Sequence, residues 1–405
     1  MLEVPTGRLF VALLLLLALG TAAAVIVLWP DGEGRPTLSP SLRVQTFQAE
    51  VERAVEERCP FGQSGVCTAA EIRLLDGARR GERSHLTLSG GPVGPDLDPG
   101  DTVRVVRNEV PPGADPAAIA PYSFVDFERR APLLWLALGF AALVVVFGRL
   151  RGALSLVGLA VSLAIVAAFV VPAILEEKPP LGVALAGSLA VMFATIPLAH
   201  GLGAKSVAAM LGTAGSLLLT VALAVAFSRL THLTGLSSEE ATLLRAGGAD
   251  LSLDGLIVAG MVIGALGVLD DVTVSQASTV LAVRAADPRQ GFRALYRRGL
   301  AVGRDHVTAT VNTLVLAYVG ASLPVLLVFS AGGVGAFDAV NLELVAKEVV
   351  GTLVGSIGLI AAVPLTTALA AMPAERLRPI PSSPPPLIVT EEGGSAGAGP
   401  ADPRV

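Results

Sequence analysis

About eight apolar stretches, each close to the length of a bilayer-spanning helix, constrain the fold of this chain more than any other feature. A helix needs about 20 mainly apolar residues to cross the hydrocarbon core of a membrane. Apolar residues form 53% of the 405-residue chain and charged residues only 16%, which excludes an ordinary soluble domain. We therefore predict an all-α polytopic membrane protein. The expected spans are Phe10–Leu28, Leu133–Phe147, Leu154–Leu175, Leu181–Ala199, Val207–Phe227, Leu256–Leu269 with its polar extension, Val307–Phe329 and Val349–Ala371.

The first stretch predicts a membrane anchor rather than a cleaved signal peptide. Phe10–Leu28 is longer than the core of an ordinary signal peptide, and its hydrophobicity continues past the small residues Ala22–Ala24. We expect residues 1–29 to form an N-terminal transmembrane anchor.

The polar segment 30–131 contains no spanning run and holds both cysteines of the chain, Cys59 and Cys67. A close cysteine pair in an exported segment indicates one disulfide, whereas the same pair in the cytoplasm would be two free thiols. Short β-rich runs separated by turn residues predict a small β-rich, barrel-like module. These runs are Val44–Val51, Ile72–Leu75, Ser84–Leu88 and Thr102–Val106.

Basic residues in short loops predict the orientation, because they accumulate on the cytoplasmic side. Most of them fall on one side of the alternating path, and Arg129 and Arg130 are exceptions beside a long translocated segment. We expect both termini to be cytoplasmic, segment 30–131 to be extracytoplasmic, residues 132–372 to form a seven-helix membrane domain and 373–405 a disordered tail. The basic residues are Arg149, Arg151, Lys205, Arg284, Arg289, Arg293, Arg297, Arg298, Arg304, Arg376 and Arg378. High arginine, alanine and glycine content favours a bacterial source, and hence the bacterial cell membrane.

Two adjacent carboxylates, Asp270 and Asp271, follow a glycine-rich apolar run. At about 100° per residue, small and polar residues fall on one narrow stripe of a helix. An ionisable group at membrane depth normally faces a bundle interior or a wet cavity, so we predict that Asp271 binds a cation or proton. If the helix ends here, both carboxylates lie instead in interfacial water. The stripe contains Gly260, Gly264, Gly267, Asp271, Ser275 and Ser278.

The penultimate span carries a second polar face, on which Asp305, Thr308 and Asn312 lie within about 60° of each other. Asn312 could equally join helices by a hydrogen bond or bind a solute. Asp305 stands beside Arg304, so a local ion pair is the alternative to a role at a pathway end.

The last span repeats the small-residue pattern, with Gly351, Gly355 and Gly358 on one stripe and Glu348 one turn earlier. Small residues let neighbouring helix backbones approach closely, so we expect these glycines, together with Gly260, Gly264 and Gly267, to pack helices.

Soluble-enzyme motifs are missing from the sequence. The stretch Gly201–Ser206 resembles a phosphate loop but has Ala204 in place of a required glycine, and it joins two spans. The four histidines lack metal-ligand spacing, and no nucleic-acid motif is present. We therefore expect neither an enzyme, nor a cofactor, nor a nucleic-acid partner.

Three long strings resemble the YibE/F family of bacterial multi-pass membrane proteins. They are GALGVLDDVTVSQAS from Gly264, GRDHVTATVNTLVLAYVGASLP from Gly303 and GTLVGSIGLIAAVPLTT from Gly351. Shorter matches are His232–Ser237 and the turn Gly100–Val103. The resemblance implies a multi-pass membrane protein but no particular activity.

Within the family pattern a single aspartate aligns with Asp271, so Asp270 is a departure. The Asp305 and Asn312 positions match the pattern directly.

From these observations we expect secondary or passive transport of an ion or small solute. Asp271 and Ser275 would line the pathway, Asp305 and Glu348 would mark its ends, and Thr308 and Asn312 would contribute neutral ligands. The alternative is a non-transporting cell-envelope scaffold or assembly subunit whose exported module, 30–131, binds a protein partner.

Overall fold

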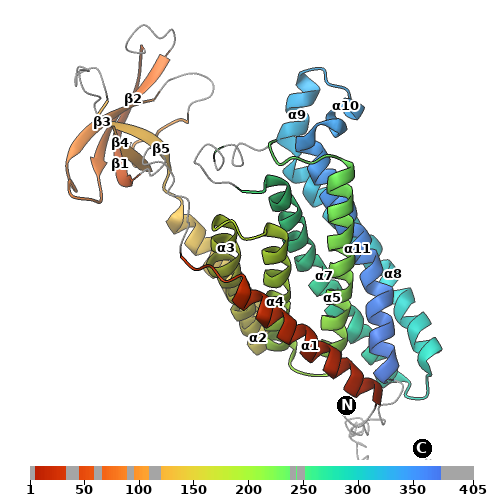
Figure 1. The fold of residues 1–405 in the computed structure, drawn as a ribbon. Coiled ribbons are helices and arrows are strands. Elements are labelled where there is room, and N and C mark those ends of the chain that lie inside the picture. Colours follow the sequence, from red (N-terminus) through yellow and green to blue (C-terminus); the bar gives the residue numbers. More distant parts are fainter. Residues whose placement is uncertain are drawn as a thin grey trace, which may run out of the picture.

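The computed structural model describes residues 5–32, 45–58, 66–88, 95–108, 120–237, 243 and 251–374. It contains a bundle of long helices and a small β-barrel beyond one end of that bundle (Figure 1). The expected tail, 373–405, lies outside the described residues from 375 onward. The helices are α1 Pro5–Val27, α2 Arg130–Ile165, the π-helical turn η3 Val166–Val170, α3 Val171–Leu175, α4 Pro180–His200, α5 Ala204–Leu230, α7 Leu253–Ala286, α8 Phe292–Ala321, α9 Leu323–Ala331, α10 Ala336–Asn341 and α11 Glu343–Ala374.

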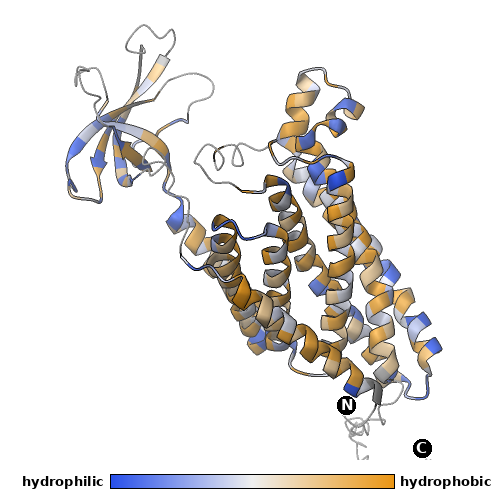
Figure 2. Cartoon of the chain, viewed as in Figure 1, coloured by the Kyte–Doolittle hydropathy of each residue, from blue (hydrophilic) through white to orange (hydrophobic). Residues whose placement is uncertain are grey.

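Six of the described helical segments are long and apolar enough to cross a membrane. A seventh crossing results if α8 and α9, which are bent by 56° at Ser322, form one broken span. Hydrophobic residues run along the lengths of these helices, as Figure 2 shows. The prediction of a mainly helical membrane protein is confirmed, whereas the number of eight spans stays a prediction.

The eighth span depends on a break inside α2. Arg149 has φ 50° and ψ −133°, outside the helical region, in the middle of a run that is otherwise helical from 130 to 165. A β-carbon on Gly152 would overlap the Val144 carbonyl oxygen, so the chain on the two sides of the break is in close contact. Figure 1 shows the start of α2 and helix α3 at the same end of the bundle, so the chain reverses direction at this break.

The β module is a closed barrel with strand order β1-β2-β3-β5-β4. Neighbouring strands are antiparallel except β3 and β5, which are parallel, and the long β1 pairs with both β2 and β4. This topology is that of the oligonucleotide- and oligosaccharide-binding (OB) type of Greek-key barrel. The strands are β1 Thr46–Arg58, β2 Val66–Leu74, β3 Arg83–Leu88, β4 Thr102–Arg107 and β5 Tyr122–Phe127.

Alternating side chains fill the interior of the barrel, as the period of a strand requires. Val51, Ile72, Leu86 and Val103 are almost completely buried there. The expected β-rich module is thus present. Strand β5 was not among the predicted β-rich runs, because its short aromatic run, Tyr122–Phe127, comes just before a much longer apolar span.

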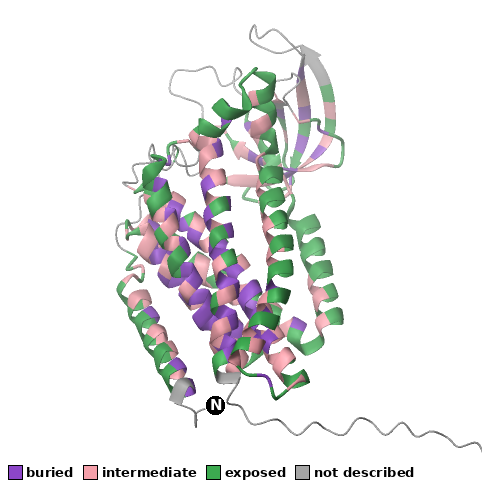
Figure 3. Ribbon diagram, turned by 90° about the vertical axis from the view of Figure 1, so that its right-hand side faces the viewer, coloured by how far each residue is buried: buried purple, intermediate pink, exposed green. Residues whose placement is uncertain are grey.

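Helix α7 is the centre of the bundle and packs against α4, α5, α8 and α11. Its core residues Val262 and Leu269 are buried together with Met192 of α4, Leu217 of α5 and Leu359 of α11. Figure 3 shows buried residues gathered along the inner helices, with long exposed stretches on the outer ones.

The end of α1 is fastened to the turn between α3 and α4. The backbone N–H groups of Asp31 and Gly32 donate to the Glu176 carboxylate at 2.7 and 3.0 Å. Lys178 Nζ donates to Asp31 Oδ2 at 2.8 Å, and this hydrogen bond raises the pKa of Lys178. Trp29 stacks on Phe169 with the ring centroids 5.7 Å apart. These contacts hold the first span against the bundle.

Candidate functional site

The two adjacent carboxylates of α7 lie in different surroundings. Asp270 is half-buried toward α4, where its Oδ2 accepts a hydrogen bond from Thr195 Oγ1 at 3.3 Å. Its Oδ1 is buried and has no hydrogen-bond partner among the described residues. Asp271 is exposed and lies within electrostatic range of His200 and His306. The inward-facing carboxylate is therefore Asp270, not the Asp271 that the stripe of small residues favours.

Neither carboxylate forms an ion pair with a basic side chain among the described residues. The ion pairs that join described residues lie in the β-barrel, in the link to α2 and at the Asp31–Lys178 contact. An ionised carboxylate in a poorly solvated position is costly unless a proton or cation compensates it.

Asp270 begins a row of polar side chains on the inner face of α7, spaced three residues apart. Thr273 Oγ1 lies 2.6 Å from Thr213 Oγ1 of α5. Gln276 Nε2 donates to Thr367 Oγ1 of α11 at 2.7 Å and to the Gly299 carbonyl of α8 at 2.8 Å. With Thr195 of α4, the row connects α7 to all four helices around it.

This row of polar side chains was not among the residues predicted from the sequence. A signal was available, because Asp270, Thr273 and Gln276 share one face of a helix that is otherwise largely apolar. The glycines and serines of the neighbouring stripe formed a longer and more conspicuous pattern.

The stripe itself borders open space. A β-carbon on Gly260 or Gly267 would meet nothing within 4 Å, and one on Gly264 would meet only Tyr318 Oη, at 3.6 Å. The structure thus differs from the close packing expected at these three glycines. Helix α8 instead approaches α7 at Gly299 and Gly303, where added β-carbons would lie within 3 Å of Val280 or Gln276. We call the open strip along Gly260, Gly264 and Gly267 the glycine furrow.

The glycine furrow joins Glu348 to Asp271. At the end nearer the start of α7, Gly260 lines a cavity of about 270 Å³ together with Tyr318, Lys347 and Glu348. At its other end, eleven residues along α7, stands Asp271, and eleven residues of helix correspond to roughly 16 Å. Two carboxylates therefore mark the ends of one exposed strip of small residues.

In the described part of the chain, none of the other residues predicted for the pathway is hydrogen-bonded to Asp271. Ser275 donates to the Val272 carbonyl at 3.0 Å, and Thr308 donates to the Arg304 carbonyl at 2.9 Å, both within their own helices. Asp305, Thr308 and Asn312 are exposed on α8.

The remaining predicted residues concern packing and the disulfide. In the last span Gly351 and Gly355 face Met261 and Leu314 at ordinary contact distances, and Gly358 packs tightly on α5. Cys67 is disulfide-bonded, and Cys59 lies outside the described residues. Within the described ranges, no group of three histidine, cysteine or acidic side chains is arranged to hold a metal ion.

Apolar helices of spanning length, with unpaired carboxylates among them, define a helical membrane protein. The chain belongs to the YibE/F-like protein family, whose model matches residues 136–376. The matched region begins inside α2 and covers α3 to α11, so it includes the glycine furrow and leaves out α1 and the barrel. No curated protein and no solved structure matches the chain.

Proposed function

We propose that this protein carries a proton or small cation across the bacterial cell membrane by secondary or passive transport. The observation that carries the proposal is the glycine furrow, an open strip of small residues with Glu348 at one end and Asp271 at the other. Residues without side chains leave room for a solute, and carboxylates attract cations at both ends.

In this proposal Asp271 receives the cation. Asp270 is a second carboxylate, which alternates between a charged state and a state neutralised by a bound proton or cation. The buried, unpartnered Oδ1 of Asp270 supports that role, because a proton or cation bound there would neutralise the carboxylate. Ser275, Thr308 and Asn312 would supply neutral oxygens near the furrow, and Asp305 would mark the cytoplasmic end.

The proposed topology has eight spans, both termini in the cytoplasm and the barrel outside. The chain reversal at Arg149 supports the count, since it divides the segment 130–175 into two arms. The ends of α7 and α11 and the starts of α5 and α8 lie at one end of the bundle (Figure 1), and the basic loops adjoin these ends. Cytoplasmic loops are the ones that carry such basic residues.

The test is ion flux into liposomes that contain the purified full-length protein. A pH-sensitive dye and a panel of monovalent and divalent cations would report flux through the wild type, and Asp271→Asn is expected to abolish it. Asp287→Asn, at the cytoplasmic end of α7 but outside the furrow, is the matched control and is expected to retain flux. Wild-type liposomes that pass no ion under any gradient would refute the proposal.

The alternative is an envelope scaffold that binds a protein partner through its barrel. The OB-type topology favours it, because barrels of this type commonly bind ligands on one face, although fold alone does not define a function. Deletion of the barrel would abolish function in the scaffold, whereas Asp271→Asn would leave it intact.

A further inference from the structure

A polar cavity lies between the end of α5 and the start of α7. Figure 1 shows both helix ends at the end of the bundle nearer the barrel. The cavity has a volume of about 310 Å³, and we call it the α5–α7 cavity. A smaller cavity of about 110 Å³ extends from it toward α4. Ser228, Arg229 and Asp254 line both cavities, so the two adjoin.

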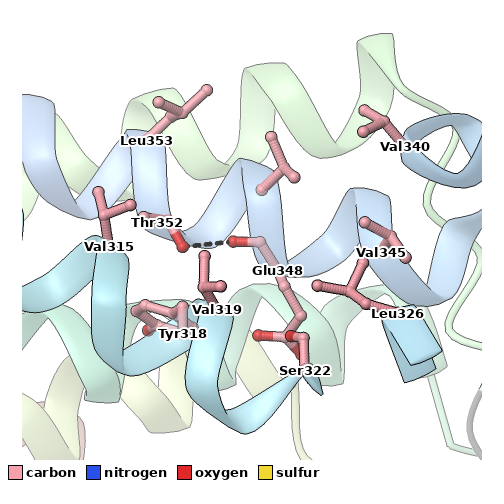
Figure 4. Close-up of a pocket in the computed structure, with 11 residues that line it drawn as sticks. Val315, Tyr318, Val319, Ser322, Leu326, Val340, Val345, Glu348, Thr352 and Leu353 are labelled. Carbon is pink, nitrogen blue, oxygen red and sulfur yellow. Dashed lines mark hydrogen bonds between the residues drawn. The ribbon is translucent and has the colours of Figure 1, made fainter. Parts of the chain in front are cut away.

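The wall of the α5–α7 cavity differs in character from that of the cavity between α8 and α11. Figure 4 shows the latter lined almost entirely by aliphatic side chains. The α5–α7 cavity instead has Arg229, His232 and Asp254 in its wall, and polar atoms are exposed to its interior. It therefore suits a charged ligand rather than an apolar one.

Arg229 and Asp254 carry opposite charges but are not paired with each other. Asp254 lies within electrostatic range of Arg229, yet the ion pairs among the described residues include neither of them. Each charge has the sign that stabilises its own helix end, a cation in the last turn of α5 and an anion in the first turn of α7. Two complementary charges thus line one cavity without neutralising each other.

The wall beside these charges is held in one conformation by α11. Glu343, the first residue of α11, accepts hydrogen bonds from the backbone N–H groups of Thr234 and Gly235 at 2.8 and 2.6 Å. The Thr234 hydroxyl donates to the same carboxylate at 2.7 Å. His232 has φ 52°, a left-handed conformation that persists only where surrounding contacts fix it. The cavity is therefore preformed, so a ligand would need to order little of its wall.

The charged groups of the α5–α7 cavity match a phosphate joined to an ammonium group. A guanidinium such as that of Arg229 binds phosphate oxygens through two parallel N–H donors, and Ser228 and His232 offer further donors. The Asp254 carboxylate accepts hydrogen bonds from an ammonium. A simple anion would leave Asp254 without a partner, and a simple cation would leave Arg229 without one.

We propose that the α5–α7 cavity binds a phosphoethanolamine-type zwitterion, with its phosphate at Arg229 and its ammonium at Asp254. A free zwitterion and a phospholipid head group share this chemistry. The apolar part of a lipid would lie in the smaller cavity, against Leu181, Val225 and Val258. The site is separate from the glycine furrow, so binding here does not depend on the proposed transport.

The test is titration calorimetry of O-phosphoethanolamine into the purified full-length protein in detergent. Binding should be saturable and about tenfold or more tighter than that of inorganic phosphate or ethanolamine, since each of these makes only one of the two charged contacts. Arg229→Gln should lose most of the binding. Asp254→Asn should bind phosphoethanolamine no more tightly than inorganic phosphate. The matched controls, expected to bind like the wild type, are Arg293→Gln and Asp338→Asn, at exposed positions outside both cavities.

A second variant and a second probe complete the test. Arg229→Lys keeps the charge but loses the paired donors, so it should weaken binding even if Arg229→Gln does not fold. Dihexanoyl phosphatidylethanolamine distinguishes the two sources: tighter binding than the free head group identifies a lipid site, and equal affinity identifies a soluble zwitterion. Absence of binding by both probes, unchanged binding in a folded Arg229→Gln, or equal affinity for phosphoethanolamine and inorganic phosphate would overturn the inference.

Discussion

Gly358 of α11 lies directly against Thr220 of α5, so closely that a β-carbon on the glycine would overlap the threonine hydroxyl oxygen. The contact has a counterpart, because Gly212 of α5 lies in the same way against Thr366 of α11. In these two reciprocal contacts, the backbone of one helix packs directly against a threonine side chain of the other. Close packing through small residues therefore occurs between α5 and α11, whereas Gly260 and Gly267 of α7 border open space.

Gly358→Ala should destabilise the protein by about 1–3 kcal/mol, the usual cost of forcing an extra methyl group into a packed contact. Thermal unfolding of the purified protein in detergent measures the change. Gly267→Ala adds the same methyl group where nothing lies within 4 Å, so it should leave stability unchanged or raise it slightly. Equal destabilisation by the two variants would show that the α5–α11 contact is looser than described.

Gly267→Leu should block flux while the protein remains folded. The furrow has room for a side chain at this position, so the fold should tolerate leucine, but the leucine would then fill the pathway. Gly139→Leu on α2 is the matched control, since its β-carbon also meets nothing within 4 Å and it lies far from the furrow along the chain. Liposome flux with both variants tests the prediction, and undiminished flux in Gly267→Leu would exclude the furrow as the route.

Gln276→Leu should destabilise the bundle by about 0.6–2 kcal/mol, the range of hydrogen bonds between membrane helices. The substitution removes the hydrogen bonds to Thr367 of α11 and Gly299 of α8. A double-mutant cycle with Thr367→Val isolates the side-chain pair, and we expect the combined loss to be smaller than the sum of the single losses. Additive losses would mean that Gln276 and Thr367 do not interact.

Asp126, near the end of β5, pairs with Arg129 in the link to α2 and should stabilise this junction only above strongly acidic pH. The hydrogen bond from Arg129, 2.7 Å away, and then that from the Phe127 N–H lower the pKa of Asp126. A lowered folded-state pKa means that the stabilisation is present above the unfolded value, about 3.9, and is lost as the pH falls through the folded value. Hydrogen exchange of the Phe127 amide, corrected for its intrinsic pH dependence, should show protection at pH 5 that disappears in strong acid. Asp126→Asn should lack this pH-dependent step.

Local pattern was sufficient to predict much of the architecture. In a membrane, a long apolar run such as Val207–Phe227 can satisfy the hydrogen bonds of its backbone within one segment only as a helix. The structure has helix α5 at this place, over Ala204–Leu230. The β-rich segment was recognisable from alternating residues, as in Thr102–Val106, which is β4. No sequence pattern predicts the left-handed backbone of Arg149. A chain reversal inside a continuous apolar run leaves the spacing of the hydrophobic residues unchanged.

The sequence by itself determined that the chain is a helical membrane protein of the YibE/F-like family and that carboxylates lie within its α7 segment, since length, hydropathy and short strings of residues are local properties. Only the tertiary structure decided which carboxylate points inward. Asp270 and Asp271 are about 100° apart on the same helix, and the position of α4 makes Asp270 the inner one. In the same way, α7 and α11 carry similar stripes of glycine. The stripe of α11 packs against neighbouring helices, whereas the stripe of α7 borders open space and forms the glycine furrow.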